Sequence, residues 1–200
     1  MNEAKKPQLQ HPISDVLAQR WSPYVYESRP VPRADIESLF EAVRWAPSAY
    51  NEQPWRYLLA TQDEDAEFDR LLSCLVEPNQ AWAKAAWVLG LGIVRTMFQR
   101  NGKPNATAHH DLGLGSASLL VEATKRGLMV HQMSGILPDR ARELYSVPEG
   151  FDILTGLAIG YPGSLEAAPE AFRERDQMPR SRKPLSEFVF GEDWGKPWTS

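Results

Sequence analysis

Ten residues hold the densest group of side chains that could bind a flat, polar molecule. Residues 46–55 read APSAYNEQPW, with two prolines enclosing small, hydroxyl and amide residues. Each proline fixes its own backbone and pushes the preceding residue out of helical geometry, so we expect a stiff loop with Ala46 and Gln53 extended. Ser48, Asn51 and Gln53 would then offer donors and acceptors that no helix or sheet consumes. The simpler alternative is a rigid surface loop with a helix-capping serine.

Arginines occur at two places that could bind an anion. Arg20 and Ser22 lie where a short helix should give way to irregular chain, and Arg180 and Arg182 lie in a proline-rich, charged tail. A guanidinium forms bidentate, charge-assisted hydrogen bonds to phosphate. Taken alone, each set has a simpler interpretation, because an arginine at a helix end complements the helix dipole and a charged run is usually solvated. No spacing rule connects the two sets.

The elements that would position these residues follow from the hydrophobic pattern. Helical spacing of apolar residues, or a proline at a favoured first position, predicts helices over residues 13–20, 33–45, 64–75, 106–126 and for about two turns from Pro138. Short apolar runs predict strands over residues 55–61, 85–94, 128–133 and 151–160. The run at 85–94 is apolar enough to be buried on both faces. Strands between helices, without strict alternation, indicate an α+β layered domain.

The composition describes a single globular domain and excludes several classes of function. The 200 residues are 42% hydrophobic and 24% charged, which suits one domain with a real core. A net charge of −4 argues against nucleic-acid binding, and no apolar run reaches the about 20 residues that span a membrane. Cys74 is the only cysteine, and its helical context predicts a half-buried structural thiol. With no secretory pattern at the start, we expect a cytoplasmic protein.

The loop at residues 46–55 resembles the signature loop of the nitroreductase family of FMN-dependent oxidoreductases, which reads roughly A-P-S-x-x-N-x-Q-P-W. The resemblance implies a nitroreductase-like layered fold, with a central, mainly antiparallel sheet flanked by helices and a C-terminal arm that crosses to a partner subunit. The cofactor-binding residues that it implies in this loop are Pro47, Ser48, Ala49, Asn51 and Gln53.

The same resemblance connects the two basic segments. In the family, an arginine-rich segment near the N-terminus and a basic-x-arginine pair near the C-terminus together hold the FMN phosphate. The matching cofactor-binding residues are Arg20, Trp21, Ser22, Arg180 and Arg182. Tyr24 stands where many members carry another basic residue, so phosphate affinity should be lower unless the tyrosine hydroxyl substitutes.

A third motif, HQMSGI at residues 131–136, resembles a family segment that reads H-Q-M-x-G-F. Ser134 and Gly135 match the positions whose backbone approaches N5 of the flavin, and small residues suit a close approach. Gln132 and Met133 complete this predicted cofactor-binding segment.

Three more positions in and around these motifs need a separate interpretation. Asn79 matches a family asparagine that bonds the flavin pyrimidine, which makes it a cofactor-binding candidate. Trp82 stands where some members place a lysine near the N1–O2 edge, and Lys84 could compensate. For His131 the simpler alternative is a buried strand histidine bonded to a carbonyl, and we assign it no role as an acid.

Other patterns do not support a different chemistry. GLGSAS at residues 113–118 lacks the third glycine of a dinucleotide-binding loop and follows no strand. His109, His110 and Asp111 are adjacent rather than spaced for one metal, and no hydrolase motif is present. We therefore expect no metal. We name no catalytic side chain either, because in flavin chemistry the cofactor performs the redox step.

The resemblance implies an FMN-dependent enzyme that transfers electrons from NAD(P)H to a nitroaromatic, quinone or similar acceptor by a ping-pong mechanism. It also implies a homodimer with sites at the interface. Residues 1–12 would be a flexible arm, 13–163 the FMN-binding domain, and 164–200 an extension that contributes phosphate and dimer contacts. Two alternatives remain open: a member with different flavin chemistry (dehydrogenase, dehalogenase or flavin-degrading), or a non-enzymatic flavin-binding module.

Overall fold

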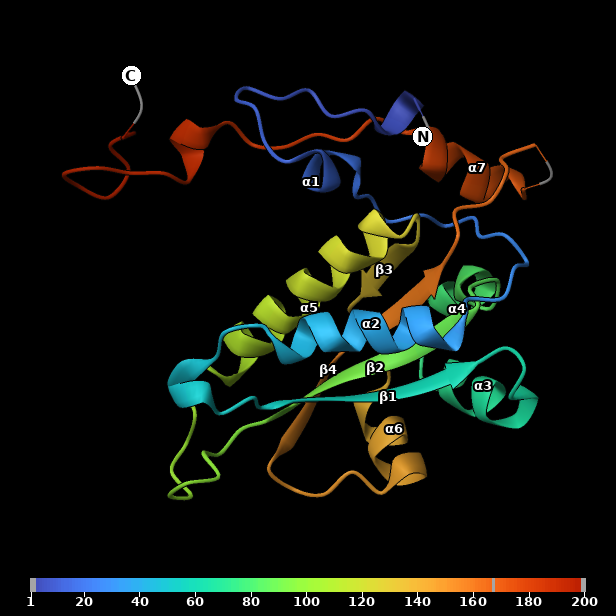
Figure 1. Ribbon diagram of the computed structural model, residues 1–200, viewed down its shortest axis with the longest axis horizontal. Coiled ribbons are helices and arrows are strands. Elements are labelled where there is room, and N and C mark those ends of the chain that lie inside the picture. The colour runs from blue at the N-terminus through green and yellow to red at the C-terminus, as the bar shows by residue number, and fades with distance from the viewer. Residues whose placement is uncertain (1–2, 167, 199–200) are drawn as a thin grey trace.

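A four-stranded sheet forms the centre of the computed structural model, which describes residues 3–166 and 168–198 (Figure 1). The strands are β1 (Trp55–Thr61), β2 (Val88–Arg95), β3 (Met129–Met133) and β4 (Phe151–Gly160). Their order in the sheet is β1-β2-β4-β3, and every neighbouring pair is antiparallel. The predicted α+β architecture with a mainly antiparallel sheet is confirmed.

Helices cover both faces of this sheet, and a hydrophobic cluster fills each of the two layers between helices and strands. One face carries α2 (Arg33–Arg44) and α5 (Ala108–Lys125), which pack against each other. The opposite face carries α3 (Asp65–Leu72), α4 (Glu77–Ala83) and α6 (Pro138–Tyr145). Within the described ranges, no helix is long and apolar enough to cross a membrane.

The remaining short helices belong to the two ends of the chain and to one loop. They are α1 (Asp15–Gln19), α7 (Glu170–Gln177) and the 3₁₀ turns Glu3–Lys5, Ala49–Asn51 and Leu185–Glu187. Figure 1 shows the N-terminal segment in blue and the C-terminal segment in red running side by side along one edge of the molecule. The N-terminal and C-terminal segments therefore contact each other, although the sequence separates them widely.

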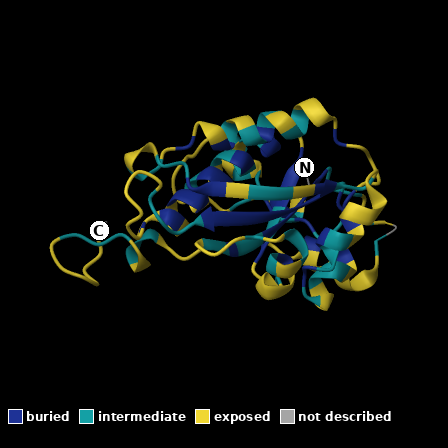
Figure 2. Cartoon of the chain, turned by 90° about the horizontal axis from the view of Figure 1, so that it is seen from below, coloured by how far each residue is buried: buried dark blue, intermediate teal, exposed yellow. Residues whose placement is uncertain are grey.

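Strand β2 is the buried centre of the fold, as its apolar run predicts. Every residue from Val88 to Val94 is buried (Figure 2). Val88 belongs to the cluster beneath α2 and α5, and Leu89 belongs to the cluster beneath α3 and α4. The strand starts at Val88 rather than at the predicted residue 85, because Ala85 and Ala86 form turn hydrogen bonds to the end of α4.

Two helices were not predicted, and one was predicted too long. Helix α4 carries a single large apolar side chain, Trp82, and α7 reads EAFRERDQ, so neither shows an apolar stripe in sequence. The predicted helix over residues 64–75 ends at Leu72, because the chain then turns so that Leu75 bridges Ile136. In these places tertiary contacts, not local periodicity, decide the structure.

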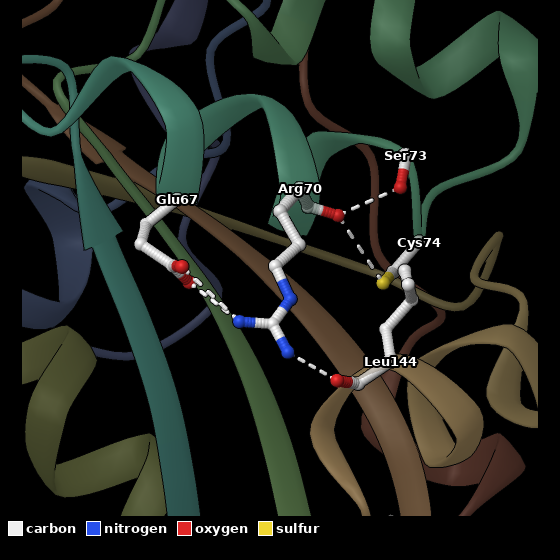
Figure 3. Close-up of polar contacts among 5 residues, drawn as sticks. All are labelled: Glu67, Arg70, Ser73, Cys74 and Leu144. Atoms are coloured by element: carbon white, nitrogen blue, oxygen red, sulfur yellow. Dashed lines mark hydrogen bonds and ion pairs between the residues drawn. The ribbon is translucent and has the colours of Figure 1, made fainter.

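Arg70 joins α3 to α6 across the face that these helices share (Figure 3). Its guanidinium pairs with Glu67 at 3.1 Å and donates a hydrogen bond to the carbonyl of Leu144. The backbone carbonyl of Arg70 accepts from Ser73 Oγ at 2.7 Å and from Cys74 Sγ at 3.5 Å. Burial raises the pKa of the Cys74 thiol. The expected structural thiol is confirmed, although it is fully rather than half buried.

Asp176 anchors α7 to the segment that follows α1. Its buried carboxylate accepts hydrogen bonds from the backbone N–H groups of Tyr24 at 2.9 Å and Val25 at 3.0 Å. Lys5 is also buried and donates from Nζ to the carbonyls of Arg175 and Met178 at 2.9 and 2.8 Å. The part of the predicted N-terminal arm that contains Lys5 is therefore packed against the C-terminal segment.

Replacing Asp176 with alanine tests this anchor. Asp176→Ala leaves two partly buried N–H groups without their acceptor, so we expect the free energy of unfolding to fall by about 1–3 kcal/mol. Glu174→Ala is the matched control, because Glu174 is exposed on the same helix. Chemical denaturation followed by circular dichroism measures both. Equal stability of the two variants would show that the carboxylate does not anchor α7.

Candidate functional site

The two basic segments that the sequence places far apart meet in the structure. Arg180 donates from Nη1 to the carbonyl of Arg20 at 2.6 Å and from Nη2 to the carbonyl of Ala18 at 2.5 Å, across 160 residues of sequence. Arg20 in turn donates from Nη1 to Ser22 Oγ at 3.4 Å. The C-terminal tail is thus held against the end of α1, and the residues predicted to bind phosphate lie together.

Three guanidinium groups lie in this region, and the described part of the chain pairs none of them with a carboxylate. Burial, and then the charge of Arg182, lowers the pKa of Arg20. Burial lowers the pKa of Arg180 as well, followed by the charges of Arg20 and Arg182. Among the described residues, none of the three arginines forms an ion pair with a carboxylate. Because these positive charges repel one another, the arrangement favours a bound anion.

A groove runs past these arginines between the two ends of the chain. Its volume is about 990 Å³. Besides the three arginines, its walls include the apolar side chains Leu9, Ile13, Leu17, Leu185 and Phe188. A buried donor, Nε of Arg180, has no hydrogen-bond partner among the described residues. Trp21, predicted as a neighbour of the ligand, is instead buried, with Lys5 Nζ 5.3 Å from the centre of its ring.

Asn79 and Gly135 also contact each other. The resemblance implies that both bind the same flavin ring, so their proximity is expected. Asn79 Nδ2 donates to the carbonyl of Gly135 at 3.0 Å, and the N–H of Val76 donates to the same carbonyl at 3.1 Å. A Cβ on Gly135 would collide with Asn79 and would lie 2.8 Å from Val76 Cγ2, so only glycine fits. Ser134 is exposed, whereas Met133 is buried in the core.

Tyr24 and Trp82, which stand where the resemblance implies basic residues, form a cluster of three mutually contacting rings with His131. The ring centres of Trp82 and His131 lie 4.4 Å apart in a stacked arrangement, and Tyr24 lies edge-on to both at 5.1 and 4.8 Å. His131 Nδ1 hydrogen-bonds the carbonyl of Pro23 at 2.8 Å. The alternative of a histidine bonded to a carbonyl is therefore confirmed. Trp82 is almost fully buried, which places its ring in the core.

The signature loop has an unusual backbone that its own side chains stabilise. Tyr50, Asn51 and Gln53 have positive φ angles of 54°, 55° and 50°. The prediction that Gln53 is extended was wrong: Ser48 Oγ accepts from the Gln53 N–H at 3.0 Å, and Gln53 Nε2 donates to the Asn51 carbonyl at 3.1 Å. These bonds hold a conformation that the following proline alone would disfavour.

Asp111 fixes this loop to α5. The carboxylate is buried, and its Oδ2 accepts from the N–H of Ala49 at 3.1 Å. The sequence analysis considered Asp111 only as a possible metal ligand and rejected that role, so it did not predict this contact. Asn51 is exposed, and among the described residues its side-chain amide makes no hydrogen bond. That amide is therefore available to a ligand.

The loop and the arginines do not meet within one chain. The loop lies near the beginning of α5, and α1, which Arg20 follows directly, lies toward the other end of that helix (Figure 1). A helix of 18 residues is about 27 Å long. This length exceeds that of an FMN molecule. The structure thus brings the predicted arginines together, joins Asn79 to Gly135, and leaves the signature loop apart from the arginines.

The sequence profile of the nitroreductase family matches residues 17–161. The chain belongs to the nitroreductase family. One crystal structure, described as that of an oxidoreductase containing FMN, is 34% identical and superposes with a TM-score of 0.89, covering 97% of this chain and 98% of that one. The nitroreductase fold and an oxidoreductase activity follow for this chain.

Two curated relatives are similar to this chain, and one of them is named for this kind of enzyme. An uncharacterised 15.4 kDa protein of Mycolicibacterium smegmatis is 33% identical over 63% of this chain and 84% of its own length. A protein of Streptomyces coelicolor, named as a candidate NADH dehydrogenase/NAD(P)H nitroreductase, is 27% identical over 78% of this chain and 83% of its own length.

The direction in which the pKa of His131 is shifted gives a test of whether this histidine is buried in the aromatic cluster. Burial, above all, lowers the pKa of His131, so the neutral ring stabilises the fold above about pH 6.5, and this contribution is lost as the pH falls through the lowered value. His131→Asn keeps a donor near Pro23 but does not titrate. We therefore expect the free energy of unfolding to fall more steeply in the wild type than in this variant as the pH falls below about 6.5.

Urea denaturation at several pH values measures these slopes, with the exposed His110→Asn as the control for the substitution itself. Parallel pH profiles for the wild type and His131→Asn would contradict the burial of a neutral histidine.

Proposed function

We propose that this nitroreductase-family protein binds FMN and transfers electrons from NAD(P)H to a nitroaromatic, quinone or similar acceptor. The observation that carries the proposal is the convergence of Arg20, Arg180 and Arg182 beside Ser22. The printed description of the related crystal structure supports FMN, and the name of the Streptomyces coelicolor relative supports NAD(P)H. A test for steady-state NAD(P)H oxidation separates this proposal from a non-enzymatic flavin-binding module.

The residues at the arginine cluster suit a phosphate monoester. Arg20 and Arg182 offer charged N–H groups and Ser22 offers a hydroxyl, which are the donors that a phosphate dianion prefers. Arg180 already donates to two backbone carbonyls, so its main role would be to hold the tail in place while its charge adds to the field. FMN carries one such phosphate at the end of its ribityl chain.

The rest of the chain would bind and orient the flavin ring. Asn79 and Gly135 offer an amide and a closely approaching backbone, and the signature loop offers the exposed amide of Asn51. Bound FMN would supply the two-electron redox chemistry, so the protein needs no acid of its own. Donor and acceptor would occupy the same open site in turn, which predicts ping-pong kinetics; intersecting lines in initial-rate plots would contradict it.

A homodimer would unite the two groups of residues. Because α5 separates the loop from the arginines, we propose that each flavin contacts the arginines of one subunit and the signature loop of the other. Phe188, Trp194 and Trp198 are exposed on the projecting tail (Figure 2), and we propose that residues 164–200 dock on the partner. Such an interface should exceed about 2,000 Å². A monomer with bound flavin in sedimentation equilibrium would contradict it.

The absorbance spectrum of the purified protein tests the proposed function. We expect a yellow protein whose noncovalently bound chromophore is FMN, because the phosphate donors are present. Anaerobic addition of NADPH or NADH should bleach the flavin band, and a quinone should restore it. A protein that stays colourless with excess FMN, or that releases FAD, would contradict the proposal. A bound flavin that neither nucleotide reduces would favour the binding-module alternative.

Alanine variants test the phosphate contacts. Arg20→Ala and Arg182→Ala each remove a charge-assisted hydrogen bond worth about 1.5–3 kcal/mol, so FMN affinity should fall about 10- to 150-fold. Turnover of the flavin-loaded variants should change less, because the phosphate is remote from the reacting ring. Fluorescence titration of the apoprotein measures the affinity. Arg33→Ala, which removes an exposed arginine of α2, is the control. Unchanged affinity in both test variants would place the phosphate elsewhere.

A further inference from the structure

A surface of aromatic rings and one arginine adjoins the signature loop and has no role in the binding of flavin described above. It consists of Tyr50, Phe98 and Arg100, and we call it the Tyr50 surface. The ring centres of Tyr50 and Phe98 lie 5.8 Å apart, edge to face. The guanidinium carbon of Arg100 lies 4.0 Å from the Tyr50 ring centre and 5.2 Å from that of Phe98. Among the described residues, Arg100 pairs with no carboxylate.

A small hairpin holds Arg100 in this position. Met97 bridges Pro104, Phe98 N–H donates to the carbonyl of Lys103 at 2.8 Å, and Gly102 N–H donates back to the carbonyl of Phe98 at 2.8 Å. The carboxylate of Glu52 accepts a hydrogen bond from the N–H of Gln99, which ties the hairpin to the signature loop. The signature loop and the hairpin thus lie side by side and together form the Tyr50 surface.

Packing of the core does not explain this surface. Tyr50 is 75% exposed, although its φ of 54° is a costly conformation for a bulky residue. A guanidinium stacked on an aromatic face keeps its N–H edge free for a carboxylate or sulfonate. Tyr50 and Phe98 supply the aromatic platform on which a flat ring would lie. The charged neighbours are Lys103 on the same hairpin and Glu52, whose carboxylate already binds Gln99.

We propose that the Tyr50 surface is the subsite for the electron acceptor and selects flat aromatic acceptors that carry an anionic group. The inference rests on the proposed function, because the signature loop then lies beside the flavin of the partner subunit. The acceptor ring lies against Tyr50 and Phe98, and its carboxylate or sulfonate binds the edge of Arg100. The phosphates of NADPH share the anionic chemistry, so the test includes the electron donor.

The test compares 4-nitrobenzoate with its neutral methyl ester on the FMN-loaded protein. In Arg100→Gln we expect kcat/KM for 4-nitrobenzoate to fall about tenfold, the low end for a hydrogen bond between charged groups, while the value for the ester is unchanged. Lys103→Gln is the matched control, because it removes an exposed cation from the same hairpin. The affinity of the oxidised protein for 4-nitrobenzoate without a reductant, followed by perturbation of the flavin spectrum, should fall by the same factor.

The possible results of these measurements either support or overturn the assignment of the Tyr50 surface to the acceptor. Equal losses for the acid and the ester, no loss for either, or the same loss in Lys103→Gln would overturn it. A loss confined to the KM for NADPH would overturn it as well and would assign the surface to the electron donor. Failure of the wild-type protein to bind FMN, or of NAD(P)H to reduce it, is seen before any acceptor is added and counts against the proposed function instead.

Discussion

The return of the C-terminal tail to the end of α1 is the contact on which the candidate site depends. Arg180 makes it with two hydrogen bonds to backbone carbonyls, and hydrogen bonds of Lys5 and Asp176 also join α7 to the N-terminal segment. The contact gathers three positive charges that repel one another. Burial and neighbouring charge both lower the pKa values of Arg20 and Arg180, so a bound anion would relieve the repulsion between these groups. This repulsion is the physical reason for proposing a phosphate site at the cluster.

A second constraint is the length of α5, which spans the face of the sheet between the arginines and the signature loop. Asp111 pins the loop at the beginning of this helix, whereas α1 lies toward its other end (Figure 1). No rearrangement of side chains could bring the two groups together in one chain. A second copy of the chain could do so, and the exposed aromatic residues of the tail would then gain a partner.

The sequence predicted the sheet closely, whereas several contacts of the candidate site depend on features that a sequence does not display. Strands β1 and β4 have the predicted bounds, because their apolar runs are enclosed by turn residues. Helices α4 and α7 were not predicted, because neither has an apolar stripe. Contacts of Trp82 stabilise α4, and contacts of Asp176 stabilise α7. The positive φ of Gln53 depends on the Ser48 hydroxyl, and the meeting of Arg20 with Arg180 depends on the whole fold. Resemblance to a family connected the two arginines; no rule of spacing could have done so.

The most direct measurement compares the affinities of the apoprotein for FMN and for riboflavin, which differ only in the phosphate. If the arginine cluster binds that phosphate through at least two charge-assisted hydrogen bonds, FMN should bind at least about 100-fold more tightly. The difference should shrink as the salt concentration rises, because part of it is electrostatic. Equal affinities for the two flavins would contradict the assignment of the arginine cluster as the phosphate site.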